Sequence, residues 1–272
     1  MTRAMFLALV VACPVFAQDL APETSPKPQP KQSSPIPPQV APAATPPAED
    51  AKRENAAETD DSVALVGVRD LLRETDADYA ACLAQLDAMG VTYTEAEPLI
   101  PEDDADCGIL RPLMVSEISA GVAISPSAML RCETATALAL WAKDFVLPAS
   151  ERLSDRGAAA GQRTAIENGS GYVCRRRNNQ PTGKLSEHAF GNAFDVMAFR
   201  FEDGSRLAIE PRETEGSMAE AFQDAVRGAA CMDFSTVLGP GSNAAHADHL
   251  HLDIIARTSG YRLCEQSGAD PD

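Results

Sequence analysis

Residues 186–196 read SEHAFGNAFDV, and this stretch determines how the C-terminal half of the chain folds. His188 and Asp195 are separated by six residues, and Gly191 lies between them. Glycine has no side-chain bulk and tolerates left-handed backbone angles, so a tight loop can lead directly into a strand. The segment therefore predicts a loop and a strand that bring His188 and Asp195 close to each other.

A second segment, residues 246–253, reads HADHLHLD, and the two segments together contain all four histidines of the chain. If residues 248–253 form a strand, side chains alternate between its two faces. His249, His251 and Asp253 then project from the same face. The segment predicts two neighbouring imidazoles, of which one can bind a metal ion and the other can exchange protons.

Two imidazoles and one carboxylate form a known set of three zinc ligands, which leaves a position for water. A lone histidine or aspartate on a strand more often belongs to a hydrogen-bond network, and H-x-H alone is a weak pattern. The patterns H-x6-D and H-x2-H-x-H occur together here and use every histidine. Their joint occurrence favours a metal site.

Four segments outside these motifs have helical apolar spacing. Residues 79–89 are followed by Gly90 as a C-cap, and we expect the helix over residues 133–146 to end at Pro148. The other two helices are expected over residues 63–72 and 215–230.

Five short segments have strand character, and they cover residues 91–93, 114–118, 164–173, 194–201 and 249–255. Helices and strands mix without a regular βαβ alternation. We therefore expect an α+β domain with a small, mainly antiparallel sheet and flanking helices.

Residues 1–17, MTRAMFLALVVACPVFA, have the charge and apolar pattern of a secretory signal peptide. Cleavage after Ala17 fits this pattern. A lipobox-like reading of residues 10–13 is the alternative, and it would leave Cys13 as a lipidated N-terminus. Both readings predict an exported, periplasmic protein, and we expect no transmembrane helix in the rest of the chain.

Residues 18–61 contain half of the chain's 20 prolines and lack apolar periodicity. This composition predicts a disordered, proline-rich tether. Residues 62–272 are enough for one domain with a real core.

Six cysteines remain after removal of the signal peptide, and an even number in an exported chain predicts three disulfides. Spacing alone does not choose among the 15 possible pairings. Cys82 with Cys107 is our first guess, because the segment between them is short. No C-x2-C pair is present, which argues against a cysteine-based zinc ribbon.

The formal net charge is −17, from 40 acidic and 23 basic residues. Nucleic acids and anionic membrane surfaces attract proteins with clustered positive charge. The composition therefore argues against both classes of partner.

The pattern S-x-H-x2-G-x-A-x-D over residues 186–195, followed by H-x-H over residues 249–251, resembles the signature of the D-Ala-D-Ala metallopeptidases. That group includes murein endopeptidases and the hedgehog signalling domain. The fuller pattern adds Cys174-Arg175, Ala230-Cys231 and FSTVLGPGS at residues 234–242. It is similar to the bacterial extensin-like C-terminal domain family over about residues 80–265.

The resemblance implies a hedgehog-like, disulfide-stapled fold and makes His188, Asp195 and His251 the ligands of one zinc ion. His249 matches a histidine beside the metal and is our first choice as general base. His246 is the second choice, because many relatives have glutamate at that position.

Arg175 falls where related peptidases keep an arginine that holds substrate or the developing oxyanion, and Arg177 is the alternative. Either arginine can instead be a solvated surface charge. Ser186 and Asn192 are expected to fix the loop.

The activity implied by this resemblance is zinc-dependent hydrolysis of an amide in peptidoglycan, by a D,D-endopeptidase or a D,D-carboxypeptidase. Zinc lowers the pKa of a water molecule, and a neighbouring imidazole takes its proton. Two alternatives stay open. One is a zinc-containing binding module of the cell envelope without turnover, and the other is a structural envelope protein whose histidines only make core hydrogen bonds.

Overall fold

The computed structural model describes residues 67–102, 104, 106–155, 163–212, 216–257 and 259–264. All of these fall within the predicted domain of residues 62–272. The predicted signal peptide, the alternative lipidation site at Cys13, the tether of residues 18–61 and the start of the first predicted helix lie outside the described residues.

Helices form at all four expected places. Thr75 caps the second helix by accepting a hydrogen bond from the Asp78 backbone N–H, and Ser217 caps the last one by accepting from Glu220. Gly90 follows the second helix with a φ of 72°, as expected of a C-cap glycine. In the described part of the chain, no helix has the length and apolar character to cross a membrane. The α-helices are α1 (Val68–Leu71), α2 (Asp76–Ala88), α3 (Cys132–Trp141), α4 (Leu147–Asp155) and α5 (Met218–Ala230).

The prediction that Pro148 ends the helix after residue 146 is wrong. The chain passes from α3 through a π-helical turn, Ala142–Val146, directly into α4. Pro148 is the second residue of α4 and has no N–H to donate to the preceding turn. The Leu147 N–H bonds the Ala142 carbonyl five residues back, and this π-helical turn carries the chain past the missing donor.

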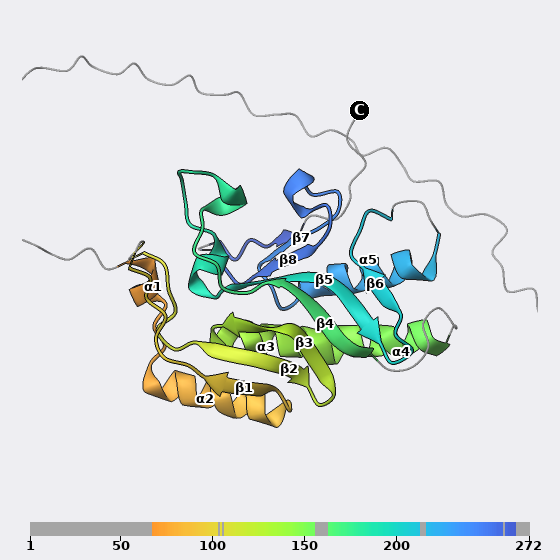
Figure 1. Cartoon of the computed structure of the whole chain (residues 1–272), viewed down its shortest axis with the longest axis horizontal. Coiled ribbons are helices and arrows are strands. Elements are labelled where there is room, and N and C mark those ends of the chain that lie inside the picture. Colours follow the sequence, from red (N-terminus) through yellow and green to blue (C-terminus); the bar gives the residue numbers. More distant parts are fainter. Residues whose placement is uncertain are drawn as a thin grey trace, which may run out of the picture. The chain divides into compact units, whose positions relative to one another are not determined.

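The strands belong to one sheet with the order β1-β2-β3-β4-β5-β8-β7-β9, and β6 pairs with β5 outside this path (Figure 1). Most pairs are antiparallel, whereas β3 with β4 and β7 with β9 are parallel. The strands are β1 (Thr92–Glu95), β2 (Leu113–Ser119), β3 (Val122–Leu130), β4 (Arg163–Ser170), β5 (Ala193–Phe201), β6 (Arg206–Ala208), β7 (Thr236–Leu238), β8 (Leu250–Asp253) and β9 (Leu263–Cys264).

The predicted α+β class is confirmed, but the sheet is mixed and larger than expected, with nine strands. β3 was missed because Pro126 argues against a strand. Its pairs with β2 and β4 use residues 122–125 and 128–130, so the ladder does not require a donor at Pro126. β6, β7 and β9 have two or three residues each, too few for a periodic signal.

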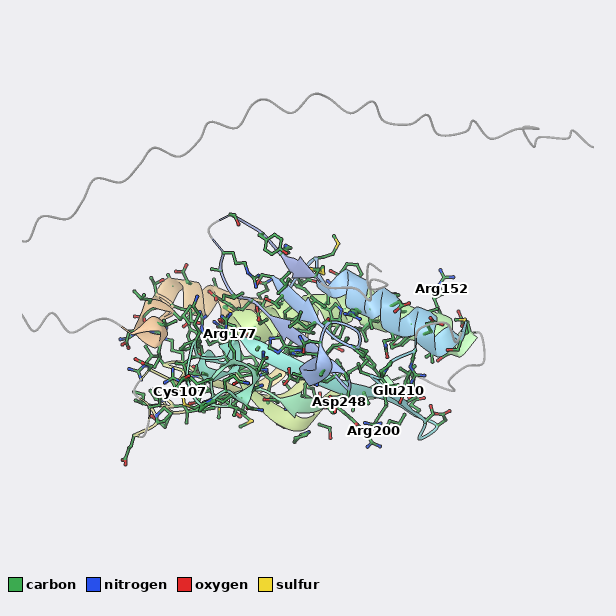
Figure 2. The ribbon with its side chains drawn as sticks, turned by 90° about the horizontal axis from the view of Figure 1, so that it is seen from above. Cys107, Arg152, Arg177, Arg200, Glu210 and Asp248 are labelled. Carbon is green, nitrogen blue, oxygen red and sulfur yellow. A yellow bond between two sulfur atoms is a disulfide. The ribbon has the colours of Figure 1, made fainter. Side chains whose placement is uncertain are left out.

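The three predicted disulfides are present, but the guess that Cys82 pairs with Cys107 is wrong. The pairs are Cys82–Cys132, Cys107–Cys174 and Cys231–Cys264. Cys82 lies on α2, which packs against α3, so its partner is close in space and distant in sequence. Cys107 lies at the end of the molecule that also carries Arg177 (Figure 2).

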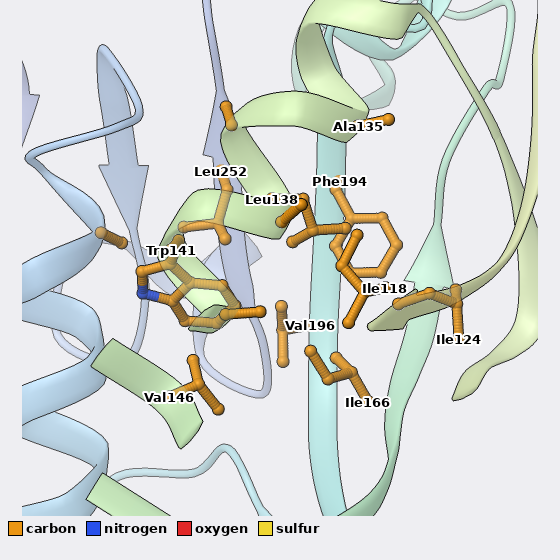
Figure 3. Close-up of a cluster of buried hydrophobic side chains, with 14 of the residues drawn as sticks. Ile118, Ile124, Ala135, Leu138, Trp141, Val146, Ile166, Phe194, Val196 and Leu252 are labelled. Carbon is orange, nitrogen blue, oxygen red and sulfur yellow. The ribbon is translucent and has the colours of Figure 1, made fainter. Parts of the chain in front are cut away.

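The core lies between α3 and one face of the sheet. Trp141 is fully buried, donates its indole N–H to the Val226 carbonyl at 2.9 Å, and contacts Phe199 of β5. Leu138 and Trp141 meet Phe194 and Val196 of β5 and Leu252 of β8 (Figure 3). Because strand side chains alternate, Asp195 and His251, which lie between these apolar residues, project from the opposite face of the sheet.

Gly191 connects a short 3₁₀ turn, Glu187–Phe190, to β5 and has a φ of 67°. A Cβ atom at this position would collide with Cδ1 of buried Ile109 and lie 3.1 Å from the Arg131 backbone N. Gly121 has a similar φ of 76° but no atom within 4 Å of its added Cβ.

We expect Gly191→Ala to lower the free energy of unfolding by about 2–4 kcal/mol, because backbone strain and overpacking add. Gly121→Ala carries the backbone strain alone and should cost about 1–2 kcal/mol. Denaturant unfolding of both variants measures the difference. Equal losses would mean that the Ile109 contact does not constrain the loop.

Candidate metal centre

Three side chains from two strands and one turn form the site. Asp195 of β5 lies directly opposite His251 of β8 in the antiparallel register, so both project from the same face. His188 belongs to the 3₁₀ turn before β5, and the left-handed Gly191 ends that turn. Turn and sheet pairing together place the third side chain beside the other two.

The three potential ligand atoms form a nearly equilateral triangle. His188 Nε2 lies 3.1 Å from Asp195 Oδ1 and 3.1 Å from His251 Nδ1, and His251 Nδ1 lies 3.0 Å from Asp195 Oδ1. Ligands at about 2.0 Å from a tetrahedral zinc ion are about 3.3 Å apart. All three residues are buried. The group therefore has the spacing and the donor set to hold a metal ion.

The outer nitrogen of each histidine determines where the ring proton lies. His188 Nδ1 is 2.6 Å from the Gly171 carbonyl oxygen, and His251 Nε2 is 3.1 Å from Asp253 Oδ2. Both oxygens accept hydrogen bonds, so each outer nitrogen carries the proton of the neutral ring. The inner nitrogens then present lone pairs toward Asp195, which is the arrangement of metal-binding histidines.

The excess of hydrogen-bond acceptors shifts the pKa values of Asp195 and His251. Burial alone raises the pKa of Asp195, but hydrogen bonds and charges from His188 and His251 outweigh it, and the pKa lies well below its usual range. Burial lowers the pKa of His251, but Asp195 and Asp253 outweigh it and raise the pKa to about 9. The metal-free group therefore takes up a proton, since positive charge is favoured here.

His249 lies just before β8 and faces the group. Its Nε2 is 3.8 Å from Asp195 Oδ1, while its Nδ1 donates to the Asp248 carboxylate at 2.9 Å. Asp248 thus holds the proton on Nδ1 and leaves the Nε2 lone pair directed toward the group.

His246 lies on the other side of His249, with 5.2 Å between their ring centroids and 5.5 Å to the ring of His251. Its Nδ1 donates to Asn243 Oδ1 at 2.8 Å. Burial and the neighbouring histidines lower the pKa of His246 to about 4. His246 is therefore neutral at pH 7 and is a weaker base than an ordinary histidine.

A cavity of about 210 Å³ adjoins His246 and His251, and Arg175 and Arg177 line it. This is the metal-side cavity. Arg177 donates to Glu187 Oε1 at 3.3 Å and to the Leu185 carbonyl at 3.2 Å. Within the described residues, no ion pair engages the half-buried Arg175 guanidinium, so it can bind a negatively charged group.

Asn192 and Ser186 hold the turn that carries His188. Asn192 donates to Glu187 Oε2 at 3.0 Å and accepts from Arg131 at 2.8 Å, whereas Ser186 uses its backbone N–H to bond the Arg175 carbonyl at 3.0 Å. The expected fixing of the loop is therefore seen at both residues, although Ser186 acts through its backbone.

Sequence reasoning missed the outer partners of the histidines. The Gly171 carbonyl carries no sequence signal, because any residue has a carbonyl. Asp253 was placed on the face of His251, and a carboxylate two residues along a strand from a metal-binding histidine is a usable signal. A second acidic and cysteine group, Asp104 with Cys107 and Cys174, has its two sulfur atoms in a disulfide and is no metal site.

Comparison with curated proteins and with solved structures found no match. The family model described as extensin-like protein C-terminus matches residues 80–265, which is more than half of the chain and includes all four histidines. The resemblance noted in the sequence is thereby confirmed at the level of the family, and the chain belongs to the extensin-like protein C-terminal family.

Proposed function

We propose that this protein is an exported, zinc-dependent peptidase that hydrolyses an amide in the stem peptides or cross-links of peptidoglycan. The observation that carries the proposal is the convergence of three buried lone pairs next to two histidines able to exchange protons. A zinc ion held by His188, Asp195 and His251 would supply Lewis-acid chemistry and would activate a water molecule. The resemblance to D-Ala-D-Ala metallopeptidases supports the substrate class.

Each residue around the triangle has a role in this reaction. His249 accepts the proton of the attacking water, because its Nε2 lone pair faces the group and Asp248 stabilises the resulting imidazolium. The Arg175 guanidinium stabilises the oxyanion that develops on the attacked carbonyl. His246 is the second candidate for the base, since it is neutral and lines the metal-side cavity.

An exported location follows from the predicted signal peptide and agrees with three disulfides, which persist in oxidising compartments. Peptidoglycan lies in such a compartment. The second candidate function is a zinc-containing envelope module without turnover. It is favoured by His246, which stands where many of the resembling peptidases have glutamate.

The first prediction concerns the metal itself. Elemental analysis of the secreted, oxidised protein should find about one zinc ion per chain, and both His188→Ala and His251→Ala should lose it, because each removes one of three ligands. His246→Ala is the matched control and should keep its zinc. A protein that contains no zinc and takes up none on addition would leave the histidines as a structural feature.

The affinity for zinc should depend on pH. Below its pKa of about 9, His251 is protonated in the metal-free protein, so zinc must displace a proton to reach Nδ1. The apparent affinity should therefore rise about tenfold per pH unit between pH 6 and pH 8, as measured by competition with a chelator of known affinity. A constant affinity over this interval would contradict the proton that we place on His251.

Turnover separates the peptidase from the envelope module. Muropeptide release from purified peptidoglycan should be lowered about 10²- to 10⁴-fold in His249→Ala, with zinc retained, because a positioned base contributes about that much. His246→Ala should have a smaller effect. If the wild-type protein binds zinc but releases no muropeptides, the non-catalytic alternative is correct.

A further inference from the structure

A second cavity, of about 660 Å³, lies beside the metal-side cavity. Arg177, Glu187 and Ile255 line both, so the two cavities meet at the ion pair between Arg177 and Glu187. This second cavity also borders Asn192, which belongs to the loop that carries His188. The two cavities are therefore neighbours along the loop that carries His188, with Arg177, Glu187 and Ile255 as their shared wall.

The two cavities differ in volume and therefore in the size of ligand that each can hold. Ligand pockets have about 300–1,000 Å³, so the 210 Å³ of the metal-side cavity is small for more than the end of a peptide. The 660 Å³ of the second cavity is within that range. A peptide that occupies the metal-side cavity beside His251 and is too long for it can extend past Arg177 into the second cavity.

The second cavity has an apolar part that fits small aliphatic side chains. Four of its lining residues are aliphatic or aromatic: Val68, Leu72, Leu185 and Phe190. Val68 is 51% exposed although it is apolar, whereas Phe190 is buried. Methyl groups of a bound peptide would cover this exposed apolar surface.

The cavity also has a cationic part, formed by Arg176, Arg177 and Lys184. Arg176 pairs with Asp104 at 3.0 Å and Arg177 with Glu187, so both keep only part of their donors free. Lys184 is exposed and, among the described residues, has no ion-pair partner. The lining also includes the acidic residues Asp106 and Glu187, so Lys184 is the cation best placed to pair with a carboxylate of a ligand.

We infer that the second cavity binds the second branch of a cross-linked peptide with carboxylates and small aliphatic side chains. The protein is then an endopeptidase that cleaves between two peptide branches, and not a carboxypeptidase that removes a terminal residue. This inference rests on the proposed function, because it extends the substrate of that reaction from the metal-side cavity into the second cavity.

The test compares two substrates with the full-length exported protein: a cross-linked muropeptide dimer and an uncross-linked pentapeptide monomer. The wild-type protein should have the higher kcat/KM on the dimer. Lys184→Glu should lower the ratio of dimer to monomer kcat/KM about fivefold, the effect expected from one exposed ion pair, without a change in zinc content. Arg152→Glu is the matched control at the other end of the molecule and should leave the ratio unchanged (Figure 2).

Binding of the dimer, measured by calorimetry, makes the test independent of turnover. Weaker binding of the dimer by Lys184→Glu, but not by Arg152→Glu, supports the second cavity as the binding site of the second branch. If neither substrate is hydrolysed, that binding site stands, whereas the peptidase activity and the endopeptidase assignment fail. Two outcomes would overturn the inference: a preference of the wild-type protein for the monomer, or a Lys184→Glu variant with unchanged dimer binding and an unchanged ratio of dimer to monomer kcat/KM. Hydrolysis of either substrate would still support the proposed peptidase.

Discussion

The antiparallel pairing of β5 with β8 is the constraint on which the candidate metal centre depends. It sets Asp195 opposite His251 and, one residue to either side, places apolar residues of both strands in the core. A shift of one residue in this register would turn Asp195 into the core and Phe194 or Val196 out of it. The burial of these apolar side chains therefore fixes the strand register, and the register fixes the short distance between the Asp195 and His251 side chains.

The third ligand depends on a different set of contacts. The Gly191 carbonyl accepts hydrogen bonds from the Arg131 backbone N–H at 3.0 Å and from Thr134 Oγ1 at 2.8 Å, both at the start of α3. Arg131 also pairs with Glu74 at 2.9 Å, with both side chains buried. The turn that carries His188 is thus attached to the same helix that packs on the core face of the sheet.

The convergence of His188, Asp195 and His251 could be predicted from the sequence, because the information in their two segments is local. H-x6-D around a glycine and H-x-H in an apolar strand identify Asp195 and His251 through the period of a strand alone. The disulfide pairing and the continuation of the chain beyond α3 depend on tertiary packing, which the local sequence does not encode. Cys82 therefore pairs with Cys132 across two helices, and Pro148 is tolerated inside a continuous helical segment.

The ring-proton positions inferred from the outer hydrogen bonds favour a metal site over histidines that only make core hydrogen bonds. In a core network, each buried acceptor meets a donor. Here the Gly171 carbonyl and Asp253 hold the ring protons on the outer nitrogens of His188 and His251, so three acceptors face one another. If a proton is added to His251 Nδ1, this N–H can donate to Asp195 Oδ1 or to His188 Nε2. One N–H cannot make a well-aligned hydrogen bond to both acceptors at the same time. A single cation can contact all three atoms at once, so the triangle is able to hold a metal ion.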